Sequence, residues 1–480
     1  MSKQKSSAQP ASRPRQLAQS PADVTTSQKW WILLAVGIAS FMAALDGSVV
    51  NIILPVVRDA FHSDVATMEW VVTIYLLVMS GLLLSVGRLG DLRGHKVVYV
   101  AGFVVFVLGS ALCGLAPTAL LLIGFRALQA LGAAMLAANS PAILTQHFPA
   151  KERGRALGLQ ATMTYLALAL GPSLGGWLTE QLSWRAVFYM NVPVGIGALW
   201  LSTHFIPPAQ AAEQTEPFDL AGAATFLFGL SALLLGLNQG YSWGWTSPSI
   251  LALLIIAVVL LGLFIWLEQR VRSPMLDLTL FYRRLFSAAT ASAVFNYISV
   301  SSVLFLLPFY LIQGRGFEPA YAGLLLTAQP IIMAIAAPLS GALSDRIGSR
   351  FLSTFGMVVL TLGLFLLARI GPQSSALQMI VDLVLIGLGT GVFISPNTSA
   401  LLGAASRGKQ GIASGVLATA RSAGQVLGVA LAGAIFTTVE LSAQSSGATN
   451  ALYQGIAAGL LVAAGVGVLG VLTSAVRGTI

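Results

Sequence analysis

The chain has 480 residues, of which 56% are hydrophobic and only 9% are charged. A soluble core of this size has no use for so many apolar side chains, so a soluble protein is excluded and the lipid bilayer is the expected solvent. The formal net charge of +9 does not indicate a nucleic-acid partner, because the basic residues are scattered through short segments between apolar stretches. The single Cys113 and the scattered histidines lack metal-ligand spacing, so neither a metal site nor a disulfide framework is expected.

The polar start of the chain precedes a long series of apolar stretches. Residues 1–29 contain several bases and no apolar centre, which predicts a disordered cytoplasmic tail rather than a secretory signal. The stretches that follow are about 20 residues long, the length of helix that crosses the roughly 30 Å hydrocarbon layer. Fourteen membrane-spanning helices are predicted, near residues 30–54, 70–90, 97–116, 119–140, 156–178, 187–205, 219–237, 249–267, 286–312, 320–342, 351–371, 376–402, 411–436 and 451–475.

Basic residues indicate how these helices are oriented in the membrane. With the N-terminus inside, most Lys and Arg residues fall in the tail and in the loops on the cytoplasmic side. The loops on the other side carry only Arg58, Arg185, Arg315 and Arg369. Because cytoplasmic loops carry an excess of basic residues, we expect a multi-pass inner-membrane protein with both termini in the cytoplasm.

One loop sequence occurs twice and divides the chain into two halves. Residues 87–96 read GRLGDLRGHK and residues 341–350 read GALSDRIGSR, so Gly, Leu, Asp, Gly and a final base coincide. Two related bundles of six helices are implied, with a substrate site at their interface near the middle of the bilayer. The predicted parts are the tail at 1–29, an N-terminal bundle at 30–205, two linker helices with their loops at 206–285, and a C-terminal bundle at 286–480.

From about residue 30 to residue 475, several motifs occur in the order typical of one transporter family. They are LDGSVVNIILP at 45–55, the loop at 87–96, RALQALGAA at 126–134, a glycine pattern with Gly-Pro at 171–172, and RSAGQVLGVA at 421–430. The chain therefore resembles the fourteen-helix drug:proton antiporter branch of the major facilitator superfamily. The resemblance implies an all-α membrane protein with the major facilitator fold, in which two six-helix bundles are joined by two extra central helices.

Charged residues inside the apolar stretches are the candidates for proton coupling and substrate binding: Asp46, Arg126, Asp382 and Arg421. An ionised carboxylate at the centre of a membrane helix costs roughly 2.5–3.5 kcal/mol, so we expect Asp46 to exchange a proton and to hold a cationic substrate. A fixed ion pair is the alternative. Arginine stays protonated and cannot carry the proton, and the resemblance implies that Arg126 participates as the counter-charge to an acid. Asp382 is a second candidate, near enough to the outer end of its helix to reach water instead.

The repeated loop is predicted to act as a gate. Its residues are Gly87, Asp91, Arg93, Gly94 and Lys96 in the first half and Gly341, Asp345, Gly348 and Arg350 in the second. Small residues allow helices to approach closely, and Asp91 can accept hydrogen bonds from a helix N-terminus or pair with Arg93 or Lys96. Such a contact would favour one of two access states, whereas a plain solvated turn would not.

A second motif lies in the fifth apolar stretch and consists of Gly158, Gly171, Pro172, Gly175 and Gly176. Proline removes a helix hydrogen bond, and the glycines let this helix bend and pack closely against its neighbours. A sealed, bent helix would oppose proton leak, which suits exchange more than co-transport. Ordinary packing of glycines in a membrane helix is the alternative.

Aromatic residues of several helices could line a cavity and attract quaternary cations through their ring faces. They are Tyr75, Tyr165, Phe295, Tyr297, Phe305, Phe309 and Tyr310. As a group they are candidates for substrate contact, whereas lipid contact or helix packing is the more frequent role of any single one.

Together these features predict a secondary active efflux transporter that exchanges protons for lipophilic, cationic drugs or toxic compounds. An enzyme is not expected, because no cluster of His, Asp, Glu or Cys has catalytic spacing. No cofactor is expected, since the proton gradient would supply the energy and Gln410 stands where a P-loop needs Ser or Thr. A proton-coupled exporter or importer dedicated to one metabolite or antibiotic is the alternative.

The expected partners are a small-molecule substrate, protons and the lipid bilayer, with no nucleic acid, and the transporter is expected to be a monomer. A periplasmic adapter is left open as a further partner. The substrate depends on the shape of the cavity, so neither its identity nor the proton stoichiometry is predicted.

Overall fold

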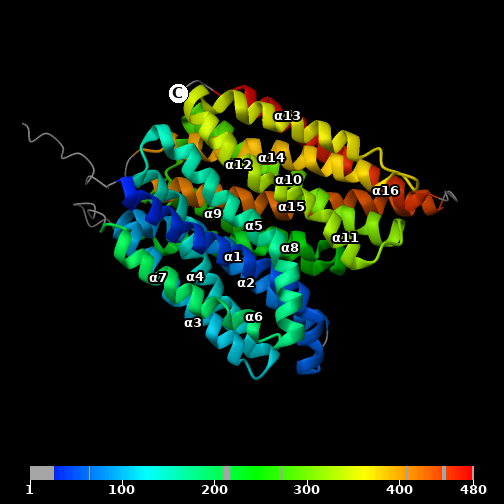
Figure 1. Ribbon diagram of the computed structural model, residues 1–480, viewed down its shortest axis with the longest axis horizontal. Coiled ribbons are helices and arrows are strands. Elements are labelled where there is room, and N and C mark those ends of the chain that lie inside the picture. The colour runs from blue at the N-terminus through cyan, green and yellow to red at the C-terminus, as the bar shows by residue number, and fades with distance from the viewer. Residues whose placement is uncertain are drawn as a thin grey trace, which may run out of the picture.

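In the computed structural model, the described residues are 26–63, 65–208, 217–271, 274–406, 409–445 and 450–477. Within these ranges every regular element is a helix (Figure 1). The first half contains α1 (Thr26–Phe61), α2 (Val65–Arg93), α3 (His95–Leu115), α4 (Ala119–His147), η1 (Ala150–Glu152), α5 (Arg153–Gln181), α6 (Ala186–Tyr189) and α7 (Asn191–Phe205). The central helices are α8 (Leu220–Trp243) and α9 (Pro248–Glu268). The second half contains η2 (Leu278–Tyr282), α10 (Arg284–Pro308), η3 (Phe309–Gly314), α11 (Pro319–Leu326), α12 (Ala328–Ile347), α13 (Ser349–Leu367), α14 (Ala376–Ala404), α15 (Gln410–Ser445) and α16 (Ala451–Ala475).

The start of α1 differs from the predicted tail. Residues 1–25 lie outside the described residues, and α1 begins at Thr26, so residues 26–29 of the predicted tail are helical. A helix that crosses the bilayer can continue into the aqueous interface, because its backbone is already hydrogen-bonded and its polar side chains are solvated there. In the predicted loop at 206–218, residues 209–216 also lie outside the described ranges.

Thirteen of the described helical segments are long and apolar enough to cross a membrane. They match the predicted stretches except for the fifth, because the 29-residue α5 is not among them. This helix has Arg153, Arg155 and Gln160 in its first part and therefore has a less apolar sequence than its neighbours. It nevertheless packs against α1 and α12, so it is part of the helix bundle.

Two of the predicted spans are each divided into a short helix and a longer one by a proline. The short helices end at Tyr189 and Leu326, the residues whose carbonyl groups Pro193 and Pro330 would pair with in a continuous helix. Proline has no N–H group, so the hydrogen-bond ladder is interrupted there. Each pair of helices still forms one candidate span, Ala186–Phe205 and Tyr321–Ile347.

The two halves meet mainly along two helix contacts. On one, α5 of the first half packs against α12 of the second, and on the other, α2 packs against α15. The central helices pack against each other, and α8 also contacts α2 and α15. In Figure 1 the blue and cyan helices of the first half lie below the yellow and red helices of the second. The end of the bundle at which α1 begins and α16 ends, toward the left in Figure 1, is called the terminal end below.

Glycines bring the backbones of the two halves together near the terminal end. A side chain on Gly87 in α2 would collide with the carbonyl group of Gly411 in α15. A side chain on Gly341 in α12 would likewise collide with the carbonyl group of Gly154 in α5. Helices associate in a bilayer through this close packing of small residues. Larger residues at these positions would therefore separate the two halves.

Candidate functional site

Asp46, in the middle of α1, forms an ion pair with Arg126 of α4. Arg126 Nη1 lies 2.5 Å from Asp46 Oδ2, and only 1% and 0% of the two side chains is exposed. Removing one member of such a pair would leave the other charge buried and uncompensated. The pair explains how the fold accommodates a carboxylate in a membrane helix. It also provides the counter-charge that the sequence resemblance implied for Arg126.

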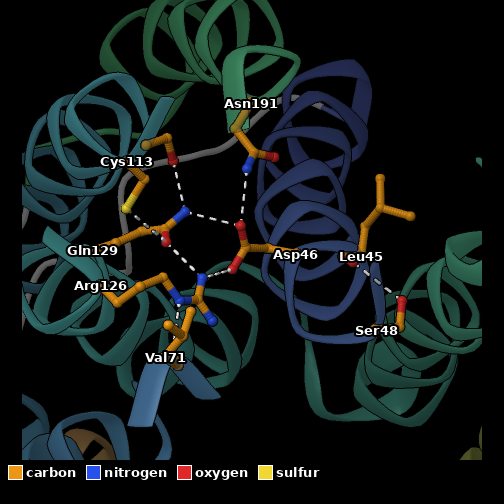
Figure 2. Close-up of polar contacts among 9 residues, drawn as sticks. Leu45, Asp46, Ser48, Val71, Cys113, Arg126, Gln129 and Asn191 are labelled. Carbon is orange, nitrogen blue, oxygen red and sulfur yellow. Dashed lines mark hydrogen bonds and ion pairs between the residues drawn. The ribbon is translucent and has the colours of Figure 1, made fainter. Parts of the chain in front are cut away.

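Two amide side chains complete the hydrogen bonding of Asp46 (Figure 2). Gln129 Nε2 donates to Asp46 Oδ1 over 2.9 Å, and Asn191 Nδ2 donates to the same oxygen over 3.1 Å. Arg126 Nη1 also donates to Gln129 Oε1 over 2.6 Å, which is possible because the two residues are neighbours on one face of α4. Both carboxylate oxygens of Asp46 accept hydrogen bonds, so a proton that binds to either one competes with these donors.

Contacts from α2 hold the other side of Arg126. Its Nε donates to the carbonyl oxygen of Val71 over 3.2 Å, and its guanidinium lies 4.1 Å from the centre of the Tyr75 ring. Tyr75 is only 4% exposed, and its hydroxyl group has no hydrogen-bond partner among the described residues. The guanidinium is thus fixed between α1 and α2.

Asn191 was not predicted as a site residue, and Gln129 appeared only as part of a motif. Asn191 begins α7 and is 1% exposed. A buried amide needs hydrogen-bond partners, so an Asn within a predicted apolar segment was the signal that could have identified it. Its partner on α1 could not be read from the sequence, because the two residues are 145 positions apart.

The other two predicted charged residues lie apart from this network. Asp382 of α14 is 4% exposed, and one of its carboxylate oxygens is buried without a hydrogen-bond partner in the described part of the chain. Arg421 of α15 has an exposed side chain and forms no hydrogen bond or ion pair with the described residues. The structure therefore pairs Asp46 with Arg126 but does not pair Asp382 with Arg421.

At the terminal end, the two aspartates of the repeated loop cap helices of the opposite half. Asp91 accepts hydrogen bonds of 2.8 and 2.9 Å from the backbone N–H groups of residues 411–412, in the first turn of α15. Asp345 accepts bonds of 2.9 and 3.0 Å from those of residues 154–155, in the first turn of α5. A carboxylate there satisfies N–H groups that lack a partner within the helix and interacts favourably with the helix dipole. Each half thus holds the other at this end.

The basic residues of the repeated loop do not pair with its aspartates. Lys96 Nζ donates to a backbone carbonyl oxygen at the end of α7 over 2.8 Å. Arg350 Nη2 donates to the last carbonyl oxygen of α16 over 2.7 Å. Arg93 is exposed and forms no hydrogen bond or ion pair within the described ranges. Of the partners expected for Asp91, the structure shows the helix N-terminus and neither base.

The turn between α2 and α3 has a counterpart between α12 and α13. Gly94 and Gly348 have φ angles of 90° and 87°, in the left-handed region that favours glycine. The first turn also contains His95, which was not predicted. Its Nε2 lies 3.2 Å from Asp91 Oδ1, and its Nδ1 lies 2.7 Å from Asn139 Oδ1. His95 thereby connects the capping aspartate to α4.

Two glycines of the fifth-helix motif pack against the part of α1 that follows Asp46. A side chain on Gly171 would collide with Ser48, and a Cβ added to Gly175 would lie 2.5 Å from Val49 Cγ1. These contacts bring α5 directly against α1 near the ion pair. A larger residue at either position would push the two helices apart.

The remaining residues of that motif have different surroundings. A Cβ added to Gly158 would lie 2.6 Å from the carbonyl oxygen of Ala337 in α12, so this glycine serves the contact between the halves. A Cβ added to Gly176 would meet open space. The side chain of Pro172 lies outside the described structure, although its backbone is part of α5.

A family model described as Major Facilitator Superfamily matches residues 36–282 and 289–477. The chain is 35% identical over 409 residues to the Riboflavin transporter RibZ of Clostridioides difficile (strain 630), covering 85% of this chain and 88% of that protein. It is 36% identical over 404 residues to the Multidrug resistance protein Stp of Mycobacterium tuberculosis (strain ATCC 25618 / H37Rv), covering 84% and 75%.

Solved structures with a similar fold include the human organic anion transporter MFSD10, with a TM-score of 0.66 and 14% identity, covering 93% of this chain and 99% of that one. The proton:xylose symporter XylE has a TM-score of 0.64 and 14% identity, covering 93% and 95%. At this level of identity the likeness shows the fold alone.

Proposed function

This chain belongs to the major facilitator superfamily and is a membrane transporter rather than an enzyme, and we propose that it exports lipophilic small molecules in exchange for protons. We place it in the inner membrane with the terminal end in the cytoplasm, because the basic residues are concentrated in the loops at that end. Similarity to the multidrug protein Stp supports drug-like molecules as cargo.

The buried network around Asp46 carries the proposal. In the structure, Arg126, Gln129 and Asn191 supply the hydrogen bonds to the Asp46 carboxylate. A proton on Asp46 would leave Arg126 without its counter-charge and would weaken the hydrogen bonds that α4 and α7 donate to this side chain. The two protonation states therefore favour different arrangements of three helices, which is what coupling a proton to a change of shape requires.

The caps at the terminal end provide the second element of an exchange cycle. They hold that end closed through hydrogen bonds from Asp91 to α15 and from Asp345 to α5. Opening the end to the cytoplasm must break these bonds, and the two halves can then rock about a site between them. In the proposed cycle, proton binding and release at Asp46 alternate with breaking and restoring the caps.

Transport of one dedicated metabolite is the second candidate function. The 35% identity to a riboflavin transporter, which extends over 88% of that protein, favours this candidate. The Asp46 network and the caps would serve it equally well, because neither depends on the range of cargo. A transport assay with riboflavin and a panel of unrelated dyes would separate the two candidates.

The proton role is tested with purified protein in liposomes, using an imposed pH difference and a panel of fluorescent lipophilic dyes of all charge types. Wild type should accumulate at least one dye against its gradient in response to the pH difference. Asp46→Asn should lose this response. Because that variant leaves Arg126 buried without a counter-charge, Asp46→Asn combined with Arg126→Gln provides a neutral network that should fold and still fail to respond.

Glu180→Gln is the matched control, since Glu180 is an exposed acid at the far end of α5. It should behave as wild type. An Asp46→Asn protein that moves dye at the normal rate with the normal pH response would refute the coupling role.

A further inference from the structure

Arg421 is a charged residue without a partner inside a helix of the bundle. Its side chain is exposed, although α15 is long and apolar, and it forms no hydrogen bond or ion pair with the described residues. A guanidinium at membrane depth remains charged and must face water or an anion. The groups around Arg421 therefore indicate whether it faces water or an anion.

Backbone contacts show which part of α2 lies level with Arg421. Gly411 of α15 approaches Gly87 of α2, and a Cβ added to Gly415 would lie 3.0 Å from the carbonyl oxygen of Leu83. As α15 advances, its contacts move back along α2, so the two helices run antiparallel. Continuing this register along straight helices places Arg421 level with about residue 77 of α2.

Three tyrosines from both halves lie within electrostatic reach of the guanidinium. Its charge acts on Tyr75 of α2, Tyr165 of α5 and Tyr297 of α10. Tyr297 lies against the next turn of α15, since its Cβ is 2.8 Å from a Cβ added to Gly424, and Tyr165 belongs to the apolar cluster on which Tyr297 packs. Because α15 packs against α2 of the first half and α10 of the second, Arg421 lies on a helix that contacts both halves.

The hydroxyl groups of these tyrosines lack acceptors. None of the three forms a hydrogen bond within the described structure, and that of Tyr75 is buried. Buried hydroxyl groups are normally hydrogen-bonded, so an unpaired one beside an unpaired guanidinium indicates that an acceptor is to be supplied from outside the chain. Every one of these groups is a donor toward an anion.

The charges of the neighbouring network do not attract a cation to this space. The carboxylate of Asp46 is already paired with Arg126 at 2.5 Å. The ring of Tyr75 already contacts the Arg126 guanidinium at 4.1 Å, so this face is not available to a second cation. A cationic substrate placed among these tyrosines would be repelled by Arg421.

We propose that Arg421 and the hydroxyl groups of Tyr75, Tyr165 and Tyr297 bind the acidic group of a planar aromatic substrate. The inference rests on the proposed transport function and replaces the cationic substrate expected from the sequence. A guanidinium binds a carboxylate, sulfonate or phosphate through two parallel hydrogen bonds, and a tyrosine can donate a further one. The tyrosine rings provide apolar surface for the aromatic body of the same molecule.

Equilibrium binding of two probes with the same aromatic body and opposite charge tests the assignment. The probes are anthracene-9-carboxylate and 9-(aminomethyl)anthracene, whose fluorescence reports binding to the purified full-length protein without any gradient. Wild type should bind the carboxylate at least about tenfold more tightly than the ammonium probe, the factor that one charge-assisted hydrogen bond supplies. Arg421→Gln should remove that preference by weakening carboxylate binding only.

Further variants separate a binding role from a structural one. Arg421→Lys should retain part of the preference, because it keeps the charge but loses the paired hydrogen bonds. Tyr75→Phe should weaken the carboxylate severalfold and leave the ammonium probe unchanged. Arg369→Gln removes an exposed arginine at the end of α13 and should match wild type. Thermal unfolding of each variant checks that the fold is intact.

The assignment is overturned if wild type prefers the ammonium probe, binds neither probe, or loses both equally on Arg421→Gln. Because binding is measured without a gradient, this result is independent of proton coupling. A charge preference that depends on Arg421, in a protein that ignores a pH difference, would refute the proposed exchange and leave the binding site standing. A pH response with no preference for the carboxylate would do the reverse.

Discussion

Asp46 and Arg421 show how differently the two halves hold charge in the middle of the membrane. In the first half, Asp46 is paired with Arg126 and hydrogen-bonded by two amides, and the network is closed to water. In the second half, Arg421 is exposed, and neither it nor Asp382 forms an ion pair among the described residues. At the terminal end the halves are alike instead, since Asp91 and Asp345 each cap a helix of the opposite half.

The two halves therefore share the capping contact at the terminal end but differ in how they hold charge in the middle of the membrane. At the terminal end the two loops have the same chemistry, since each supplies an aspartate that caps a helix of the opposite half. Exchange requires a proton site and a substrate site that need not be identical. A closed network in one half and an unpaired base in the other are consistent with assigning one site to each half.

The largest expected effect on stability comes from removing Arg126, and removing Arg421 provides the comparison. Arg126→Ala should lower the free energy of unfolding by about 3–5 kcal/mol, because it leaves the Asp46 carboxylate buried and uncompensated. Arg421→Ala should change it by less than about 0.5 kcal/mol, because an exposed residue without partners contributes little. Denaturant unfolding of the purified variants in detergent measures both.

Adding Asp46→Ala to Arg126→Ala should recover part of the lost stability, since no unpaired charge then remains. If Arg421→Ala is as destabilising as Arg126→Ala, the two halves do not differ in the way described.

An intermediate effect is expected at the caps, where the halves should behave alike. Asp91→Asn and Asp345→Asn each remove a charge at a helix N-terminus and one accepting oxygen, which should weaken the closed end by on the order of 1 kcal/mol. The readout is labelling of Ser414→Cys by a water-soluble maleimide. Ser414 is 1% exposed between Gly411 and Gly415, and the native Cys113 is 0% exposed. Both variants should label severalfold faster.

The label lies on the contact between α2 and α15, whereas Asp345 acts on the contact between α5 and α12. Equal acceleration by both variants would mean that the two contacts open together. Arg93→Gln, at an exposed residue of the same loop, should leave labelling unchanged. Acceleration by Asp91→Asn alone would show that the contacts open independently.

The smallest effect is expected at two ion pairs beside the capped helices. Lys29 pairs with Glu152 before α5, and Lys409 pairs with Asp277 before α15. Both pairs are partly exposed, so Glu152→Gln and Asp277→Asn should each cost less than about 1 kcal/mol in unfolding experiments at neutral pH. A loss above about 2 kcal/mol for either variant would show that the pair acts as part of a larger network.

The pair at Asp277 also has a defined pH dependence. Burial opposes ionisation, but hydrogen bonds from Lys409 and Thr279 outweigh it and hold the pKa of Asp277 below its ordinary value of 3.8. A lowered pKa in the folded state stabilises the protein above the ordinary pKa, and the contribution is lost as pH falls through the lower value. The stability difference between wild type and Asp277→Asn should therefore be constant near neutrality and shrink below about pH 4.

The membrane spans and the repeat could be predicted because hydropathy and motif spacing are properties of local sequence. The helix ends could not, since α1 and α4 continue into polar segments whose backbone hydrogen bonds are satisfied by the helix itself. The helix ends at Tyr189 and Leu326 were predictable in principle, because a proline leaves the carbonyl group four residues before it without a helical hydrogen bond.

The site was predicted as separate residues rather than as an assembly. Asp46 and Arg126 were conspicuous because charge is costly in an apolar stretch, but they are 80 positions apart, and their contact depends on which faces of α1 and α4 meet. For Asp91 the sequence offered a helix N-terminus or two nearby bases, and it could not show that the N-terminus would be that of α15, 320 positions away. Tertiary packing determines such partners, and the periodicity of one helix carries no information about which helix packs against it.

The exchange of caps between the halves has a consequence for biosynthesis. The first turn of α5 is made long before Asp345, which lies 191 positions further along from residue 154, and Asp91 precedes its own partners by 320 and 321 positions. Because a chain emerges from the ribosome N-terminal end first, the first half is made before the residues of the second half that complete its two caps. A chain that stopped after α9 would lack both caps, so the first-turn amide groups of α5 and the Asp91 carboxylate would be left to water.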